Sequence, residues 1–364
     1  MTSVPGPESI DDLLARVHVV ALPMRVRFRG VTEREVALIE GPAGWGEFGP
    51  FGEYDDLEST HWLASALEMA WQGPPLALRS RVPVNATVPA VAAGDVAAIL
   101  DRFPGCMTVK VKVAESGQQL VDDVARVAAV LQARPGARVR VDANGAWSVA
   151  EAAHAIRVLD QAVRADDVAR GPGTGPVSLD GPGLEYAEQP CATVEELVQL
   201  RERLAADGVH VDVAADESIR RAEDPLRVVR AGGADRAVVK VAPLGGPRRL
   251  LAVAAELGVP VTVSSALDSA VGVAAGVAAA AALPGGAGRG RPGPDDDHAI
   301  PAAGLGTGGF FVEDVVEPGT FALEDGCLPV RPVAPDPARL EGLRVGGEVR
   351  DWWLDRIRRC YELL

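Results

Sequence analysis

The stretch VKVKV (109–113) alternates valine with lysine, and this alternation decides how the surrounding chain can fold. Side chains alternate across a β-strand, so Lys110 and Lys112 leave on one face while the valines leave on the other. The valine face is suited to burial, whereas two adjacent ammonium groups need polar surroundings. We therefore expect a strand that is packed on its valine side and opens on its lysine side into the mouth of a barrel.

From about residue 82 onward, short valine-rich runs alternate with alanine- and leucine-rich helical stretches. The expected strands are VPVNATV, MTVKVKV, RVRVDAN, LEYAEQP, VDVAADES, RAVVKVAP, VPVTVSS and AIPAAGLG, and amphipathic stretches such as 118–134 and 193–207 lie between them. Repeated strand–helix alternation is typical of a parallel β/α barrel. A doubly wound open sheet is the alternative that alternation alone leaves open.

The two ends of the chain follow a different pattern. Residues 17–50 carry strand signals between turn formers, and residues 57–72 have helical spacing. The tail from about 319 does not fit the barrel unit. We expect an α+β capping domain over 1–84, completed by 319–364, and a barrel domain over 85–318. The Gly/Pro-rich segments 169–183 and 284–299 are interpreted as insertions whose role stays open.

Composition limits the classes of partner. The chain has 364 residues, 48% of them hydrophobic, and a formal net charge of −15, which argues against nucleic acid or an anionic membrane surface. The scattered Cys106, Cys191, Cys327 and Cys360 indicate reduced thiols in a cytoplasmic protein. The apolar run 270–283 is too short for a membrane span and is expected to be a helix packed against the sheet. Self-association is left open.

Carboxylates stand at the ends of three successive expected strands. RVRVD ends in Asp142, LEYAE in Glu188 and VDVAAD in Asp216. Strand ends converge on the face of a β/α barrel that carries active sites, where clustered carboxylates repel one another unless a cation joins them. Oxygen ligands with open positions suit Mg²⁺, and Mn²⁺ fits the same ligands. The alternative is that each acidic residue caps the following helix.

Lysines flank these acidic strands on both sides. Lys110 and Lys112 lie on the strand before Asp142, and Lys240 lies on the strand after Asp216. Positive neighbours disfavour protonation of a lysine, so such a residue can act as a general base. A structural salt-bridge network between lysines and carboxylates is the competing interpretation.

Two polar residues directly follow the ligand candidates. Asn144 and Glu217 could support the metal ligands from a second layer, or they could be ordinary turn and capping residues.

Five motifs, in this order along the chain, resemble the enolase superfamily and specifically its muconate-lactonizing subgroup: VKVKV, VDANGAW, EYAEQP, VAADES and VVKVAPLGG. The resemblance runs from GWGEFGPF in the first domain to the last strand of the barrel. It implies a modified (β/α)₇β TIM-like barrel under an α+β cap, with one Mg²⁺ held by Asp142, Glu188 and Asp216. The pairing of a lysine base with a metal-stabilised ene-diolate is a general feature of such sites.

Within the subgroup, GWGEFGPFGEYDD, VSSALDSAVG and AGLGTGGFF look most like the enzymes that dehydrate 2-succinyl-6-hydroxy-2,4-cyclohexadiene-1-carboxylate in menaquinone biosynthesis. By that resemblance Lys112 removes the α-proton and returns it to the departing hydroxyl, while Lys240 stabilises the ene-diolate from the opposite face. Lys110 would lower the pKa of Lys112 and position the substrate carboxylate.

The same resemblance implies that Ser264, Ser265 and Gly304 line the pocket for the succinyl tail; the alternative is that they are turn residues without ligand contact. Other functions stay open at this point. Lysines on both faces also suit an N-acylamino acid racemase or a dipeptide epimerase, and a muconate-type cycloisomerase is less favoured. A non-catalytic binding barrel, held by a ring of salt bridges, is the alternative from a different class.

Overall fold

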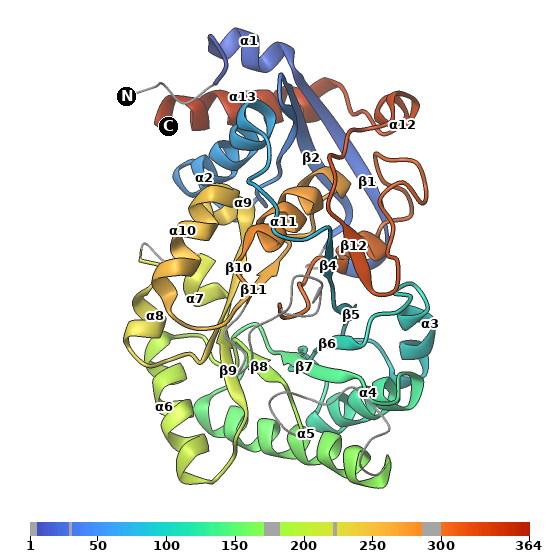
Figure 1. Cartoon of the computed structure of the whole chain (residues 1–364), viewed down its shortest axis with the longest axis vertical. Coiled ribbons are helices and arrows are strands. Elements are labelled where there is room, and N and C mark those ends of the chain that lie inside the picture. The colour runs from blue at the N-terminus through green and yellow to red at the C-terminus, as the bar shows by residue number, and fades with distance from the viewer. Residues whose placement is uncertain (1–5, 29–30, 171–182, 221–223, 286–299) are drawn as a thin grey trace.

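The computed structural model describes the chain apart from residues 1–5, 29–30, 171–182, 221–223 and 286–299. It has two parts, a cap and a barrel, and the cap covers one end of the barrel (Figure 1). Helix α1 (Ile10–Ala15) and the C-terminus both lie on the cap side (Figure 1). Most of the segments 169–183 and 284–299, interpreted above as insertions, fall outside the described residues.

The cap is built on a three-stranded antiparallel sheet in the order β1 (Val17–Phe28), β2 (Val31–Gly41) and β3 (Gly44–Phe48). Its helical elements are α1 (Ile10–Ala15), α2 (Asp56–Leu67), the π-helical turn η1 (Glu68–Gln72), α12 (Pro337–Gly342) and α13 (Gly347–Leu363). Helix α2 begins at a capping box in which Asp55 and Glu58 each accept a backbone N–H of the other.

The tail of the chain packs onto the N-terminal segment. Trp353 of α13 meets Phe48 edge-on, with 5.8 Å between ring centroids, and its indole N–H donates to Glu35 at 2.9 Å. Arg356 is buried and donates to the backbone oxygen of Tyr54 at 2.6 Å. These contacts tie α13 to the sheet and to the loop before α2, so both ends of the chain build the cap.

The barrel is a seven-stranded parallel sheet whose strands are hydrogen-bonded in chain order from β5 to β11. The strands are β5 (Ala86–Val88), β6 (Thr108–Lys112), β7 (Arg138–Asp142), β8 (Tyr186–Glu188), β9 (Asp212–Ala215), β10 (Arg236–Lys240) and β11 (Val261–Ser264). Isolated parallel bridges from Ala303 to Val84 and from Gly304 to Ser264 join its two edges. The sheet is thereby closed, which confirms the barrel and excludes the doubly wound open sheet.

Helices surround this sheet, as Figure 1 shows. In chain order they are η2 (Ala93–Asp95), α3 (Val96–Leu100), α4 (Leu120–Ala133), α5 (Val149–Arg170), α6 (Val194–Ala206), α7 (Glu217–Arg220), α8 (Arg227–Arg230), α9 (Val241–Leu244), α10 (Pro247–Leu257), α11 (Ala270–Ala282) and η3 (Gly306–Phe310). The valines of β6 and β7 that face these helices are fully buried, so the hydrophobic core lies between sheet and helices.

Two expected strands differ from the structure. VPVNATV is divided into β4 (Arg81–Pro83) and β5, and β4 pairs antiparallel with β12 (Cys327–Pro329) instead of with the barrel. In AIPAAGLG only single bridges form, because Pro301 has no N–H and Gly304 and Gly306 weaken a strand. The segment still occupies the position of the last barrel strand.

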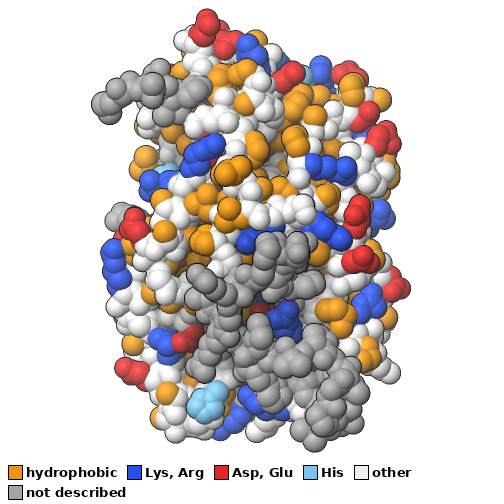
Figure 2. All heavy atoms as spheres, in the orientation of Figure 1, with side chains coloured by type: hydrophobic (Ala, Val, Ile, Leu, Met, Phe, Trp, Pro, Cys, Tyr) orange, Lys and Arg blue, Asp and Glu red, His pale blue; other side chains and the backbone are white. Residues whose placement is uncertain are grey.

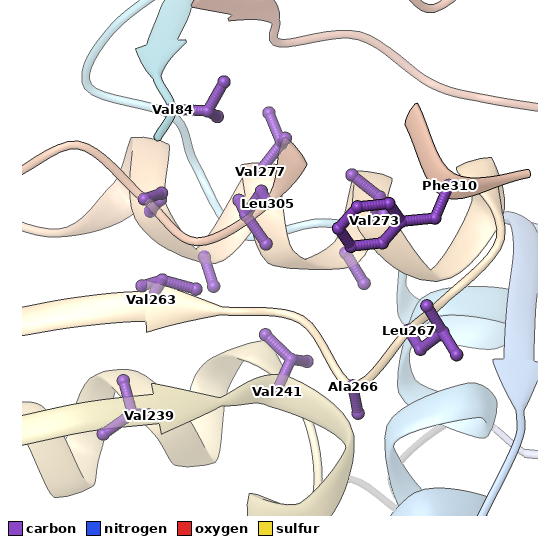
Figure 3. Packing of buried hydrophobic residues seen from close by; sticks show 14 of the residues in the cluster. Val84, Val239, Val241, Val263, Ala266, Leu267, Val273, Val277, Leu305 and Phe310 are labelled. Atoms are coloured by element: carbon purple, nitrogen blue, oxygen red, sulfur yellow. The ribbon is translucent and has the colours of Figure 1, made fainter. Parts of the chain in front are cut away.

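The run 270–283 is helix α11, as expected. It packs across the end of the barrel, and Val273 and Val277 lie beside Leu305 and Phe310 (Figure 3). No helix among the described residues is both long enough and apolar enough to cross a membrane. On the face drawn in Figure 2, basic and acidic side chains are interspersed without a large patch of one sign.

Candidate active site

The three acidic strand ends lie at one end of the barrel interior. In the sheet register Asp142 is opposite Glu188, and Asp216 follows β9 by one residue. All three side chains are buried, with exposed fractions of 1%, 1% and 3%. Because residues in register on neighbouring parallel strands point the same way, the carboxylates of Asp142 and Glu188 share one face.

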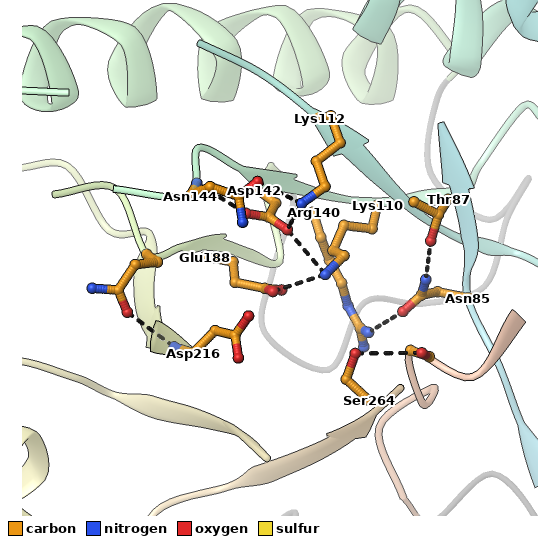
Figure 4. A network of polar contacts seen from close by, with 12 residues as sticks. Asn85, Thr87, Lys110, Lys112, Arg140, Asp142, Asn144, Glu188, Asp216 and Ser264 are labelled. Atoms are coloured by element: carbon orange, nitrogen blue, oxygen red, sulfur yellow. Dashed lines mark hydrogen bonds and ion pairs between the residues drawn. The ribbon is translucent and has the colours of Figure 1, made fainter. Parts of the chain in front are cut away.

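Lys110 and Lys112 both point toward these carboxylates from β6 (Figure 4). The ammonium group of Lys110 lies 2.8 Å from Glu188 Oε1 and 3.1 Å from Asp142 Oδ2, so it joins two neighbouring strands. The ammonium group of Lys112 lies 2.6 Å from Asp142 Oδ2 and 2.6 Å from Asn144 Oδ1. The lysine face of VKVKV therefore opens into the barrel mouth.

Lys240 reaches the site from β10, on the other side of the carboxylates. It is buried and donates to both oxygens of Asp216. Burial lowers the pKa of Lys240, against the opposing field of Asp216. The lysines thus approach the acidic strand ends from two sides, in the strand order that the sequence predicts.

The pKa of Glu188 is the clearest sign of crowded negative charge. Burial, together with the nearby Asp142 and Asp216, raises it to about 7, against the opposing field of Lys110 and Lys240. Burial also opposes ionisation of Asp142, but Lys112 and Lys110 hold its pKa below the usual range. Burial likewise opposes the charge of Lys110, yet Glu188 and Asp142 raise its pKa well above normal. The raised pKa of Lys110 is thus the opposite of what was expected of a lysine beside other cations, whereas the pKa of Lys240 is lowered, chiefly by burial.

A divalent cation fits the chemistry of these carboxylates, although they do not stand as a ligand shell. In the part of the chain that the structure describes, no group of three His, Cys, Asp or Glu side chains has metal-binding geometry. The lysine ammonium groups are bound to the carboxylates instead. Within that same part, Glu188 Oε2 is buried without a hydrogen-bond partner, and an unsatisfied buried carboxylate oxygen is a group that a cation would stabilise.

Asn144 and Glu217 form a bridge beside the metal candidates. Asn144 adopts φ +48°, and its backbone N–H donates to Asp142 Oδ1 at 3.1 Å. Its side-chain amide donates to Glu217 Oε1 at 3.3 Å. The bridge orients both Asp142 and Lys112, so the pair lies where a supporting layer is expected.

The sequence analysis did not single out Arg220 and Tyr54, which continue this bridge. Arg220 donates to Glu217 at 2.6 Å and to the hydroxyl of Tyr54, and its Nε lies 3.3 Å from Asp216 Oδ1. Arg220 stands one helical turn after Asp216, a spacing that could have indicated the pair. Tyr54 belongs to the cap, so the contact connects the cap to the barrel mouth.

The residues expected to line the distal pocket meet at the junction of β11 and the last barrel segment. Ser264 and Ser265 both donate to the carbonyl oxygen of Gly304, at 3.3 and 3.1 Å, and Ser265 Oγ lies 2.8 Å from Thr307 Oγ1. These residues and the three lysines line one cavity of about 50 Å³. A β-carbon on Gly304 would come 2.6 Å from Ser264 Oγ, so glycine keeps this wall open.

A second charged group lies deeper in the barrel and was also missed. Arg140 is fully buried and donates to Glu185 through two nitrogens, at 2.8 and 3.1 Å. It also donates to Asn85 Oδ1 at 2.9 Å and to the carbonyl oxygen of Ala302 at 2.6 Å. The alternation of RVRVD places Arg140 on the same face as Asp142, and this spacing could have predicted that Arg140 points into the barrel.

Comparisons with known proteins agree with this architecture. Residues 19–70 match the family "Enolase N-terminal domain-like", and residues 95–166 and 177–336 match "Enolase C-terminal domain-like". Among solved structures, muconate lactonizing enzyme from Pseudomonas putida is similar with a TM-score of 0.66 at 18% identity, covering 90% of this chain and 98% of that one. The L-Ala-D/L-Glu epimerase from Bacillus subtilis has a TM-score of 0.65 at 21% identity, covering 88% and 96%.

Curated relatives are much more similar in sequence. A protein of Mycolicibacterium smegmatis named o-succinylbenzoate synthase is 55% identical over 359 residues, which is 99% of both chains. A protein of Mycobacterium tuberculosis with the same name is 56% identical over 361 residues, covering 99% of this chain and 98% of the relative.

Proposed function

The chain belongs to the enolase superfamily, and on that premise we propose that it is an o-succinylbenzoate synthase. In this reaction 2-succinyl-6-hydroxy-2,4-cyclohexadiene-1-carboxylate loses water to give 2-succinylbenzoate, a step of menaquinone biosynthesis. The observation that carries the proposal is the site itself, in which lysines face buried carboxylates from two sides. Full-length relatives of that name support the assignment of substrate.

Enzymes of the enolase superfamily generally use Mg²⁺. In this proposal Asp142, Glu188 and Asp216 would hold the ion, with Asn144 and Glu217 supporting them. Bound there, the cation would supply positive charge to a substrate carboxylate and so acidify the adjacent C–H. The raised pKa of Glu188 supports this ligand set, because the field of its acidic neighbours is what a cation would offset.

Lys112 is the proposed base. Its ammonium group lies at the cavity wall, its side chain keeps 18% exposure, and Asp142 and Asn144 fix its position. As a free amine it takes the α-proton, and the resulting ammonium group can return a proton to the departing hydroxyl. Lys240 lies on the other side of the cavity, where its positive charge would stabilise the negative charge that develops on the substrate carboxylate.

The remaining residues position the substrate. Lys110 lies between Lys112 and the acidic strand ends, where it can contact the reacting carboxylate. The wall formed by Ser264, Ser265 and Gly304 is proposed to receive the succinyl tail. The domain division at 84–85 and 318–319 is part of the proposal. The two family matches, to residues 19–70 and from residue 95 onward, support the first boundary, whereas the second match continues past 318–319 to residue 336.

The cysteines bear on the compartment of the proposed enzyme. All four are buried thiols, which supports a cytoplasmic enzyme in a reducing environment.

The test is to add enzyme and Mg²⁺ to the cyclohexadiene substrate and to follow the loss of its absorbance. We expect kcat/KM for dehydration to exceed by far the value for racemisation of N-succinyl amino acids. Lysines on two sides of a carbon also suit a 1,1-proton transfer, so both reactions must be measured on one preparation. Equal efficiencies, or a preference for racemisation, would reject the proposed function.

A further inference from the structure

A second buried polar cluster lies between the cap and the barrel, outside the set of residues discussed so far. It joins Arg34 of β2 and Glu47 of β3 to the segment 267–269, which connects the end of β11 to helix α11. Arg34 is 4% exposed and Glu47 is 7% exposed. Two ionisable side chains are costly to bury at a domain boundary, so the groups that they contact indicate their role.

Glu47 binds the first residue before helix α11. Its carboxyl group accepts the backbone N–H of Ser269 at 3.0 Å and also accepts the Ser269 hydroxyl. Ser269 is the N-cap of α11, and its Oγ accepts the backbone N–H of Val271 at 3.2 Å. Glu47 therefore fixes the point at which the segment turns into the helix.

Arg34 holds the same segment two residues earlier. Its Nε donates to the carbonyl oxygen of Leu267 at 3.1 Å, and it also donates to the carbonyl oxygen of Gly49. Its guanidinium lies over the ring of Phe51, with 4.1 Å to the centroid. The cap therefore holds the backbone on both sides of Asp268, by an acceptor on one side and a donor on the other.

Leu267 is the residue that most needs such a contact. It adopts φ +63°, in the left-handed region that residues with a β-carbon rarely occupy. Such a conformation persists when its surroundings enforce it. Leu267 also lines the active-site cavity together with Ser264, Ser265 and Ala266, and Figure 3 shows it just beyond the end of β11.

Helix α11 approaches Glu47 closely at Gly272. A β-carbon there would lie 2.8 Å from the Glu47 carboxyl carbon and 2.7 Å from Cβ of Asp268. Any larger residue at 272 would push the helix away from the cap. The absence of a side chain at Gly272 thus leaves room for the Glu47 carboxyl group, which supports a specific contact between Glu47 and the start of α11.

We propose that Arg34 and Glu47 are positioning residues that act through the segment 264–269 and shape the pocket for the distal part of the substrate. This inference rests on the proposed function for the identity of that substrate. Neither side chain acts on the reacting carbon, so the effect is expected mainly on KM. A displacement of only about 1 Å at a substrate-positioning segment can change rates roughly 100-fold.

The experiment compares Glu47→Ala and Glu47→Gln with the matched control Asp314→Ala. Asp314 accepts the backbone N–H of Ala270 at 3.0 Å, so it also binds the start of α11, but from the segment that follows η3. We expect Glu47→Ala to raise KM at least about 10-fold with kcat within about threefold. Glu47→Gln keeps an acceptor for Ser269 and should restore KM to within about twofold.

The control should leave KM unchanged even if its unfolding temperature falls. An unchanged KM in folded Glu47→Ala, or an equal rise in Asp314→Ala, would overturn the proposal. Arg34→Met provides a second test through Leu267, and it should raise KM in the same direction.

A readout independent of turnover separates this inference from the proposed function. Amide hydrogen exchange in metal-free protein should become faster at Ser269 in Glu47→Ala and at Ala270 in Asp314→Ala. Unchanged exchange at Ser269 would contradict the contact. If wild-type protein has normal exchange but no dehydration activity, the proposed function fails while the cap-to-segment contact stands.

Discussion

Two glutamates three residues apart, Glu185 and Glu188, experience opposite environments inside the same barrel. Glu185 accepts two hydrogen bonds from Arg140, and although burial opposes its charge, Arg140 lowers its pKa. Glu188 shares Lys110 with Asp142, and burial and acidic neighbours raise its pKa to about 7. Arg140 and Glu185, the deep pair, balance each other's charge. At the barrel mouth, the charge of Glu188 is stabilised only in part by its neighbours.

The difference separates charge that supports the fold from charge that can do chemistry. Arg140 is fully buried, and four of its five N–H groups donate to protein oxygens, so the protein itself satisfies most of its hydrogen-bonding capacity. In the part of the chain that the structure covers, Glu188 Oε2 is buried without a partner. A buried group with a perturbed pKa and an unsatisfied atom, beside a cavity, is typical of a functional site.

The largest expected effect comes from Lys112→Ala at the mouth. Removal of a general base typically lowers turnover by roughly 10²–10⁴-fold, and because Lys112 is partly exposed the variant should remain folded. The measurement is the rate of dehydration, together with exchange of the substrate α-proton in deuterated water. Normal turnover in a folded variant would indicate a salt-bridge role for Lys112 and remove it as the base.

Substitution in the deep pair should lower stability more than turnover, the opposite of Lys112→Ala. Arg140→Met leaves Glu185 buried without its partner, and breaking such a pair typically costs about 3–5 kcal/mol of unfolding free energy. Urea unfolding measures this loss. Turnover per folded molecule should change much less than in Lys112→Ala. A stable Arg140→Met protein that has lost its activity would break the comparison between mouth and interior.

Stabilisation by Mg²⁺ should depend on pH. The pKa of Glu188 is raised to about 7, so below that value a proton competes with the cation for its carboxylate. The increase in the free energy of unfolding on adding Mg²⁺, measured by urea unfolding, should therefore grow from pH 6 to pH 8, by up to ~1.4 kcal/mol per pH unit below the pKa. Removal of the ion with a chelator should reverse the increase. An increase that does not vary with pH would exclude Glu188 as a ligand.

A further pH-dependent effect concerns Glu47 at the cap boundary. Burial and the neighbouring Asp268 raise its pKa from its usual 4.5 to about 8. The folded protein then holds a proton that the unfolded chain releases above about pH 4.5, so this contribution to stability falls as pH rises toward 8. Glu47→Gln cannot ionise. The wild type should lose stability relative to this variant between pH 5 and 8 in urea unfolding, and parallel curves would show that Glu47 is ionised throughout.

The fold class could be predicted because each strand and helix carries a local pattern. VKVKV and RVRVD show period-two alternation, and the helices between the strands show amphipathic spacing. The cap could be predicted only from segments at both ends of the chain that do not fit the barrel pattern. How α13 docks could not be predicted, because it depends on long-range contacts such as that of Trp353 with Glu35. The last strand forms only single bridges, such as that of Gly304 with Ser264, because Pro301 has no N–H and glycine weakens a strand.

The part of the candidate site that could be predicted is the part whose reactive side chains stand at the ends of neighbouring strands. Strand ends place Asp142, Glu188 and Asp216 together in any parallel barrel, so their location follows from local sequence. Contacts between residues that are distant in the sequence cannot be predicted in this way. The hydrogen bond between Arg220 and Tyr54, which lie 166 residues apart, is an example. Which carboxylate carries the unsatisfied oxygen also depends on three-dimensional neighbours that no single strand reveals.

Binding of Mn²⁺, as a spectroscopic substitute for Mg²⁺, to wild type, Glu188→Gln and Glu185→Gln would distinguish a cation site at the barrel mouth from a set of structural salt bridges. The two variants make the same chemical change three residues apart, and each is assayed at a temperature where it is folded. The account predicts that wild type and Glu185→Gln each bind the ion at the mouth, whereas Glu188→Gln loses that binding. Equal binding by both variants would contradict a cation site among the acidic strand ends.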